Sequence, residues 1–508
     1  MTPISARAAV LLPLAVAGFT SCGGNAGSRD AGASEASVGG GPGDASADDA
    51  PVGAGDHGAV STTYPAFAVD MPKVVANQGT VLTSPVIVTI TWPANDPNVS
   101  AWDAFGDAIG ASSYWQATTS EYGAGPATSG PANHVHMVQP LPKTMSYYDL
   151  QSFVLTSLGG SPPDAGGTPD AAATPDAAAT PDGGATPDAG TPEGGLDVGE
   201  GGAGANPQWP VPAGADAGDE IQTVYALFIP ASTSVTDPGS GMSFCTLGGL
   251  GYHDNVNVGG RLMSYVVTLE CASQTLAELQ ESAAHEYVEA ATNPYPESTT
   301  RLGYTGFDSN HLGWALYTGP FGNELADVCQ SWSDSYYQES AAFPYWVQRT
   351  WSNAHAAAGH DPCVPVRAAH YHGMTLFPSQ QSSLNIDLSA AGIGKVVTRG
   401  YSAPVGQSVT FQAGFYSDGD TGPWTIAYDF PPTTGLYDNT GHPIGNGTAS
   451  VTIDKTSGQN GEKAYVTVTP KTAGRLGFQV MAITWDAPAA KSQAGFLPHY
   501  QPVVLSNR

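Results

Sequence analysis

The segment HEYVEAATNP at residues 285–294 decides the fold that we expect for this chain, together with NELAD at residues 323–327. His285 and Glu289 are four residues apart, so a helix places both side chains on one face. Glu286 lies beside them, where a zinc hydrolase carries its general base. The spacing therefore predicts a metal site built on one helix.

The surrounding residues predict a domain in which helices and strands are mixed. Apolar residues recur with the helical period over 273–291, where Ser273 is a suitable N-cap and the Asn-Pro pair at 293–294 ends the helix. Shorter helices are predicted at 101–109 and 112–120. Runs rich in β-branched and aromatic residues predict buried strands at 86–92, 221–229, 265–269 and 345–351.

The residue types around the two segments suit a divalent cation. Zinc takes three or four nitrogen, oxygen or sulfur ligands in a tetrahedral arrangement. We predict His285, Glu289 and Glu324 as ligands, Glu286 as the base that activates water, and Asp327 as a side chain that orients a ligand or replaces one. A glutamate in place of a second histidine adds negative charge, which weakens zinc as a Lewis acid. Calcium is the alternative ion, because it prefers oxygen ligands.

Three other residues with suitable side chains lie close to these segments in the sequence. His253 could reach the site, although a structural, hydrogen-bonded histidine is the simpler expectation. Asp308 and His311 lie between the two motifs, where an ordinary loop is a simpler expectation than contact with a substrate. The Ser, His and Asp residues form no nucleophile-elbow motif, so the sequence does not indicate a serine hydrolase.

The pattern resembles the gluzincin group of zinc peptidases. In that group the third ligand is a Glu in an Asn-Glu motif on a later helix, followed by an Asp that orients a ligand histidine. Asn323, Glu324 and Asp327 match this pattern, with the Asp three residues after the Glu rather than the usual four. The resemblance implies a zincin-like domain and a peptide or protein substrate.

A longer series of motifs is similar to plant phosphate-induced, exordium-like proteins and to uncharacterised secreted bacterial proteins. The motifs occur in the order SYW (113–115), EYG (121–123), FC (244–245), GYH (251–253), HE to NP (285–294) and ELADVC (324–329). The resemblance covers roughly residues 75–366. It implies an extracellular protein of zincin-like fold and does not indicate a substrate.

Composition limits the classes of partner. The chain has 508 residues, which suits two domains with linkers. Its formal net charge is -29 and only 16 residues are Lys or Arg. Phosphate backbones are bound by cationic side chains, so the sequence argues against nucleic acid as a partner.

The N-terminus has the features of an export signal. Arg7 precedes an apolar run at 8–19 that is too short to span a bilayer, and Cys22 follows in a sequence that resembles a bacterial lipobox. We predict a lipoprotein-type signal peptide at 1–22, a lipid on Cys22 and a disordered tether at 23–60. The lipid would be the only contact with a membrane. The protein is then an outer-membrane or cell-surface lipoprotein, or alternatively a secreted protein.

The remaining cysteines support an oxidising compartment. They are even in number, allow three connectivities that sequence cannot choose between, and form no CxxC pair. The disulfide candidates are Cys245, Cys271, Cys329 and Cys363.

Two further regions complete the expected organisation. Residues 160–217 repeat Thr-Pro-Asp and predict a disordered insertion within a zincin-like domain at 61–366. Residues 367–508 alternate apolar and polar residues between turn signals, which predicts an all-β sandwich of Ig-like type. The expected fold class is therefore α+β, followed by a β-sandwich.

Two functional hypotheses follow from these patterns. The first is a cell-envelope, zinc-dependent peptidase that uses metal-activated water. The second is a non-catalytic surface protein in which a structural or degenerate metal site holds the fold and the β-sandwich binds polysaccharide or another protein.

Overall fold

The computed structural model describes most of the chain from residue 56 to the C-terminus. The described residues are 56–68, 70–77, 79–161, 206–212, 221–237, 240–298, 300–318, 323–330, 332, 334–366, 371–375, 381–438, 442–486 and 499–508, with the backbone alone described at 371–375. The predicted signal peptide, Cys22, most of the tether and the Thr-Pro-Asp repeats lie outside the described residues. No described helix is long and apolar enough to cross a membrane.

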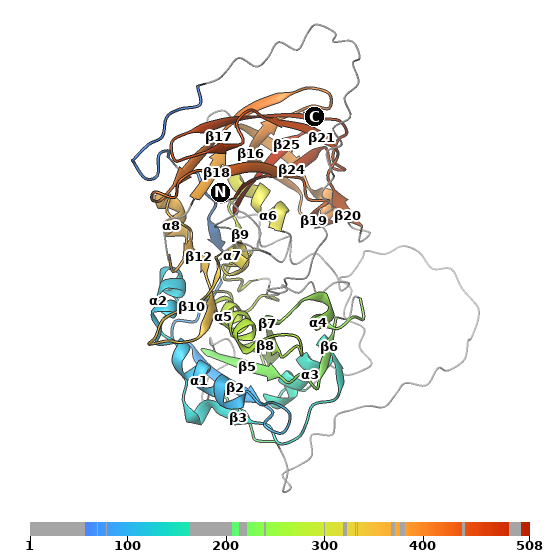
Figure 1. The fold of residues 1–508 in the computed structure, drawn as a ribbon. Helices are drawn as coiled ribbons and strands as arrows, with labels where there is room; N and C mark the ends of the chain where they lie inside the picture. Colours follow the sequence, from blue (N-terminus) through green and yellow to red (C-terminus); the bar gives the residue numbers. More distant parts are fainter. Residues whose placement is uncertain are drawn as a thin grey trace, which may run out of the picture.

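A five-stranded sheet forms the centre of the N-terminal domain, as Figure 1 shows. Its strand order is β3-β2-β5-β8-β7, in which β7 alone runs antiparallel and lies at an edge. β5 is buried along its whole length, because strands inside such a sheet are covered on both faces. The strands are β2 (Val86–Thr91), β3 (His134–His136), β5 (Thr223–Ile229), β7 (Gly251–Val258) and β8 (Arg261–Leu269).

Helices cover this sheet, and the longest is α5 (Leu276–Thr292), which contacts β5, β7 and β8. The prediction of an α+β domain is confirmed. Ser273 is not the N-cap of α5: Thr275 caps it through a capping box with Glu278, so the helix begins later than we predicted. The other helices before β8 are α1 (Val99–Ile109), α2 (Ser113–Thr119), α3 (Tyr147–Ser157) and α4 (Phe244–Leu247), with short 3-10 turns at Ser120–Tyr122 and Pro131–Asn133.

Residues 206–212, which we assigned to the insertion, pack on this domain. Trp209 is 4% exposed and lies in the same apolar cluster as the central strands. Its ring stacks on Tyr225, whose hydroxyl donates a hydrogen bond to Pro210 O. The burial of a large aromatic side chain explains why this part of a Pro-rich segment is held against the sheet.

The segment that follows α5 is made of short elements. The predicted strand at 345–351 is two strands, β11 and β12, because Arg349 interrupts the pairing. The elements of this segment are β9 (Tyr304–Phe307), which pairs with β1 (Val74–Ala76), a 3-10 turn at Ser309–His311, α6 (Leu312–Thr318), α7 (Asp327–Gln330), β10 (Tyr336–Gln338), β11 (Trp346–Gln348), β12 (Thr350–Trp351), α8 (Asn353–Ala358) and β13 (Cys363–Val364).

Two disulfides settle the pairing that the sequence left open. Cys245 pairs with Cys271, which joins α4 to the end of β8. Cys329 pairs with Cys363, which joins α7 to β13. Both disulfides indicate an oxidising extracellular or periplasmic location.

A small parallel pair of strands, β4 (Thr144–Ser146) and β6 (Ser234–Thr236), lies near α3 and α4.

The C-terminal region consists mainly of two sheets with a shared apolar core, which confirms the predicted β-sandwich. One sheet has the order β14-β17-β23-β21 and the other β15-β16-β25-β24-β18-β22, and a hairpin of β19 and β20 lies beside them. The strands are β14 (Tyr371–Thr375), β15 (Ser382–Asp387), β16 (Lys395–Ser402), β17 (Val409–Ser417), β18 (Trp424–Asp429), β19 (Thr433–Tyr437), β20 (Pro443–Gly445), β21 (Ala449–Ile453), β22 (Ser457–Gly458), β23 (Lys463–Pro470), β24 (Phe478–Asp486) and β25 (His499–Ser506), with a 3-10 turn at Ser389–Ala391.

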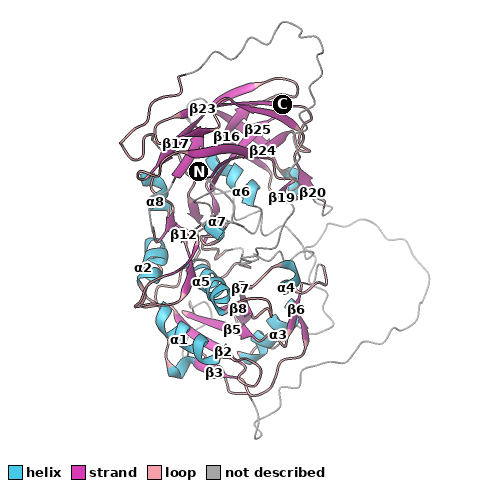
Figure 2. Cartoon of the chain, in the orientation of Figure 1, coloured by secondary structure: helices cyan, strands magenta, loops and turns pink. Residues whose placement is uncertain are grey.

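The two parts of the molecule share buried surface, and Figure 2 shows α6 against the strands of the sandwich. Trp314 of α6 lies between Trp351 and Tyr500, so aromatic rings from both parts form one cluster. The chain also reaches the sandwich at its described start, where Asn460 donates hydrogen bonds to the carbonyl oxygens of Ser61 and Thr63. Residues 56–63, which span the predicted end of the tether, therefore lie along the C-terminal domain.

Candidate metal centre

The helix α5 carries three of the predicted site residues into the interior. His285, Glu286 and Glu289 are each 0% exposed. The helical spacing of four residues brings Nε2 of His285 to 3.0 Å from Oε2 of Glu289. The predicted shared face of His285 and Glu289 is therefore present, and it points toward β7, α7 and β11 rather than toward solvent.

Asp327 approaches the same atoms from the start of α7. Its Oδ1 lies 3.5 Å from Nε2 of His285. The backbone N–H groups of Ala326 and Asp327 both donate to Oε1 of Glu289 at 3.2 Å. These bonds fix one carboxylate oxygen of Glu289 and direct the other, Oε2, toward the imidazole.

Gln348 of β11 decides how His285 is protonated. Its side-chain Nε2 donates to Ala326 O at 2.7 Å, so its Oε1 is the atom that meets Nδ1 of His285 at 3.0 Å. An amide oxygen only accepts, hence Nδ1 carries the proton. In a neutral imidazole Nε2 then presents its lone pair to two carboxylate oxygens. A cation between them, or a proton on Nε2, is needed to make that arrangement favourable.

The spacing of these three donor atoms suits a metal ion. The donor atoms of His285, Glu289 and Asp327 all lie within 4.8 Å of one another. Two ligands at about 2.1 Å from a tetrahedral zinc are roughly 3.4 Å apart, and the two distances from Nε2 of His285 are 3.0 and 3.5 Å. The imidazole nitrogen favours zinc or another transition metal over calcium, which takes six to eight oxygens.

His253 of β7 belongs to the centre, because its imidazole faces two of the carboxylates on α5. Its Nδ1 is 3.3 Å from Oε2 of Glu286 and 3.6 Å from Oε2 of Glu289, which makes a second group of close donor atoms. Glycine at position 251 lets β7 come this close to α5, since a Cβ there would lie 2.6 Å from Oγ of Ser282. His253 is hydrogen-bonded to Glu286 and to the carbonyl oxygen of Asn293, as we expected, and it also reaches the site, which was our alternative.

Glu324 lies on the far side of His253 from Glu286. Its Oε1 is 3.6 Å from Nε2 of His253 and accepts a hydrogen bond from Nδ2 of Asn293 at 2.5 Å. The structure places Glu324 beside His253 and outside the group formed by His285, Glu289 and Asp327. Its predicted role as a ligand stays a prediction, and so does the predicted role of Asp327, whose carboxylate lies near His285 and Glu289.

Buried negative charge dominates the electrostatics of the centre. Burial, together with the charge of Asp327, raises the pKa of Glu289 well above its ordinary value. Burial also raises the pKa of Asp327, and it raises the pKa of Glu324 to about 7. Burial opposes a charge on His253, but Glu324, Glu286 and Glu289 outweigh it and raise the pKa of His253 to about 10. The cluster therefore attracts either protons or a cation.

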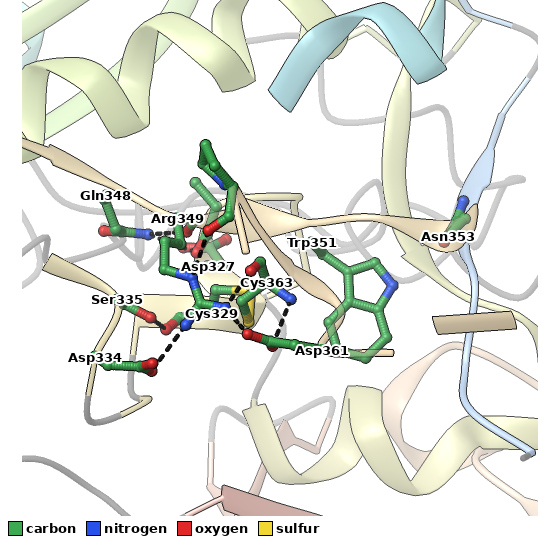
Figure 3. Close-up of a disulfide and its surroundings, with 12 residues drawn as sticks. Asp327, Cys329, Asp334, Ser335, Gln348, Arg349, Trp351, Asn353, Asp361 and Cys363 are labelled. Atoms are coloured by element: carbon green, nitrogen blue, oxygen red, sulfur yellow. Dashed lines mark hydrogen bonds and ion pairs between the residues drawn. A yellow bond between two sulfur atoms is a disulfide. The ribbon is translucent and has the colours of Figure 1, made fainter. Parts of the chain in front are cut away.

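A disulfide and a buried arginine hold the segment that carries Asp327. Figure 3 shows Arg349 between Asp334 and Asp361, beside the Cys329–Cys363 bond. Arg349 also donates to the carbonyl oxygen of Cys363. The guanidinium thus pairs with two aspartates on the segment that carries Asp327.

Asp308 and His311, which lie between the two motifs in the sequence, have a structural role. Nδ1 of His311 donates to Asp308 at 2.9 Å, and its Nε2 lies 3.7 Å from Oδ1 of Asp70. Asp70 also pairs with Arg399 of the sandwich. These side chains join the two parts of the molecule.

Two residues of the centre were missed from the sequence. Gln348 lies in a strand with no motif around it, and only its position opposite His285 reveals its role. Asn293 had a signal, since it ends α5, but its side chain also donates to Glu324 and accepts from the N–H of Gly303.

Comparisons with known proteins do not assign the chain to a family. No family model matches the chain, and no curated protein matches it. Among solved structures, a family 123 glycoside hydrolase from Clostridium perfringens matches with 10% sequence identity and a TM-score of 0.16. The match covers 28% of this chain and 27% of that one, so the chain spans about a quarter of that protein. A match of this quality carries no argument about fold or function.

Proposed function

We propose that this protein is an exported metalloprotein of the cell envelope, whose N-terminal domain binds a divalent cation through His285, Glu289 and Asp327. The observation that carries the proposal is the position of Nε2 of His285, which faces two carboxylate oxygens at 3.0 and 3.5 Å. Zinc is the expected ion, because imidazole and carboxylate are among its usual ligands. Calcium is the less favoured alternative.

The burial of the centre favours a structural role for the ion. A catalytic ion needs an open position for water and substrate, whereas a structural ion is enclosed by its ligands. His285, Glu286 and Glu289 are 0% exposed and Asp327 is 3% exposed. The ion would then tie α5 to α7, and surface binding of polysaccharide or protein would belong to the sandwich.

Peptide hydrolysis is the second candidate, and the position of Glu286 supports it. Glu286 follows His285 on α5 and faces the centre, where its Oε2 lies 3.3 Å from Nδ1 of His253. Zinc supplies an activated water and a Lewis acid in peptidases of this type. Glu286 would hold the proton of that water, and His253 would orient Glu286.

Export and a lipid on Cys22 are part of the proposal. The two disulfides support an oxidising compartment. Labelling with a radioactive fatty acid would test the lipid, with Cys22→Ser as the unlabelled control.

Metal content tests the proposal directly. The full chain would be purified without chelators or a polyhistidine tag and analysed for metal, beside Glu289→Ala and Asp327→Ala. We expect bound zinc in the parent, and its loss in both variants. Glu281→Gln is the matched control, since Glu281 is a buried carboxyl on the same helix outside both donor groups. A metal-free parent whose fold is unchanged in the variants would refute the proposal.

Two more variants separate the finer alternatives. Glu286→Gln that keeps the metal but abolishes peptide hydrolysis would support catalysis, whereas Glu286→Gln with no effect would support the structural role. Glu324→Ala tests the ligand set that we predicted from sequence, because metal loss there would restore Glu324 as a ligand.

A further inference from the structure

The centre contains two groups of donor atoms that share one carboxylate. His285, Glu289 and Asp327 form the first, and His253, Glu286 and Glu289 form the second. Within each group the donor atoms lie within 4.8 Å of one another. Oε2 of Glu289 faces both imidazoles, at 3.0 Å from Nε2 of His285 and 3.6 Å from Nδ1 of His253.

We propose that this centre binds two divalent cations, with Glu289 as the bridging ligand and His253 and Glu286 as ligands of the second cation. This inference rests on the proposed function and extends it, because it adds a second position beside the first. Two-metal sites have ions about 3.5–4 Å apart, a separation that one carboxylate can bridge.

The hydrogen bonds of His253 repeat those of His285. Nε2 of His253 lies 3.2 Å from the carbonyl oxygen of Asn293, which can only accept, so Nε2 carries the proton. Nδ1 hydrogen-bonds to Oε2 of Glu286 at 3.3 Å and also faces Oε2 of Glu289, so a cation that displaces the Nδ1 proton would meet a lone pair directed at both carboxylates. Both histidines therefore hold their outer nitrogen with an oxygen acceptor and turn the inner one toward Oε2 of Glu289, which is how metal-ligating histidines are oriented.

The distances in the second group suit ligands of one ion. Nδ1 of His253 is 3.3 Å from Oε2 of Glu286 and 3.6 Å from Oε2 of Glu289. The contact between His253 and Glu286 is a hydrogen bond, slightly longer than the usual range of about 2.7–3.2 Å. Neighbouring ligands of a tetrahedral zinc are roughly 3.4 Å apart. Glu324, at 3.6 Å from Nε2 of His253, lies on the other side of the ring and adds negative charge to this end of the centre.

Charge balance also favours two ions. The centre holds four carboxylates and two imidazoles, all of them buried or half-buried: Glu286, Glu289, Glu324, Asp327, His253 and His285. Ligands bind a metal in their deprotonated form, so two divalent cations would replace the protons of the cluster and cancel the charges of its four carboxylates. One divalent cation would leave two negative charges in a buried site, which is costly unless protons are taken up.

The second cation gives Glu286 a different role from that of a free base. If a carboxylate ligates an ion, replacing that carboxylate releases the ion. A carboxylate that acts only as a base can be replaced without loss of metal. Glu286→Gln would therefore lower the metal content by about one ion per chain if Glu286 is a ligand, and would leave it unchanged if Glu286 acts only as a base.

Metal stoichiometry tests the inference on the full chain. The protein would be loaded with excess zinc, dialysed against metal-free buffer and analysed for zinc per chain. We expect about two zinc ions in the parent, about one in His253→Gln and about two in Glu281→Gln. The parent value shows how many ions bind without depending on the folding of a variant, and two ions retained in His253→Gln would overturn the assignment of the second ion to this centre.

The outcomes separate this inference from the proposed function. About one zinc in the parent, retained in His253→Gln, would overturn the second cation and leave the single-cation proposal standing. No zinc in the parent would overturn both. About two in the parent with loss of one in His253→Gln would establish the shared centre.

Discussion

A buried carboxylate of the C-terminal domain and the carboxylates of the centre around Glu289 are neutralised in different ways. In the C-terminal domain, Asp438 is 9% exposed and pairs with the guanidinium of Arg475. In the N-terminal domain four carboxylates share two imidazoles, while the buried Arg349 is occupied by Asp334 and Asp361. Asp438 is neutralised by an arginine of its own domain, whereas the carboxylates around Glu289 face histidines, so that cluster takes up protons or a cation. That difference is the physical basis for expecting a cation in one part only.

The largest expected effect is a loss of stability on a substitution in the core of the C-terminal domain, with no change in the metal content of the N-terminal domain. Phe411 of β17 is 1% exposed and stacks on Tyr401 at a ring-centroid distance of 4.4 Å. Phe411→Ala should lower the free energy of unfolding by about 3–5 kcal/mol, because it removes an aromatic ring from a packed core. Chemical denaturation measures this, with the exposed Val397→Ala as control. Metal content should not change, and a loss of metal would break the comparison.

The disulfides offer a matched pair of changes within the N-terminal domain. Cys329→Ser/Cys363→Ser and Cys245→Ser/Cys271→Ser should each cost about 2–4 kcal/mol of stability, since both remove a cross-link. The first pair should also weaken zinc binding, because Cys329 lies two residues after Asp327 on α7. Isothermal titration with zinc checks this. Equal zinc affinities in the two double variants would show that the disulfide does not hold Asp327 in place.

Removal of the hydrogen bond that orients His285 should have an intermediate effect. Gln348→Met keeps the size of the side chain but removes its bond to Nδ1 of His285. Zinc affinity should fall about 10–100-fold, the usual loss when such a partner is removed. Gln338→Met, at an exposed position of the neighbouring strand β10, is the control. An unchanged affinity in Gln348→Met would exclude this role.

The smallest expected effect concerns a buried carboxyl on α5 that lies outside the centre. Burial, with the nearby charge of Glu278, raises the pKa of Glu281 from 4.5 to about 8. The folded chain therefore binds more protons than the unfolded chain between these values, so stability should fall as pH rises through this window. Glu281→Gln should flatten the fall and be more stable at pH 8 by at least about 1 kcal/mol, given about 1.36 kcal/mol per pKa unit.

Denaturation of the parent and Glu281→Gln at several pH values between about 4.5 and 8 provides this measurement. Metal content should stay the same in both proteins. A variant with the same pH dependence as the parent would show that Glu281 is ionised in the folded chain.

The sequence by itself determined the local part of the centre and the class of the fold. Helical spacing brings His285 and Glu289 together wherever the helix lies, so a pattern of four residues was enough. Alternating apolar residues likewise predicted the sandwich. The start of α5 was misplaced because Ser273 and Thr275 are both suitable caps, and only Thr275 has Glu278 three residues later for a capping box.

Only the tertiary structure decided which distant side chains meet this helix. His253 lies in the centre because β7, the antiparallel edge strand, packs on α5. Gln348 lies beside His285 because β11 packs on the same helix. The choice between Glu324 and Asp327 beside His285 depended on the backbone of 324–327, which hydrogen-bonds to Glu289. Contacts between residues far apart in the chain depend on strand order and packing, which local residue patterns do not encode.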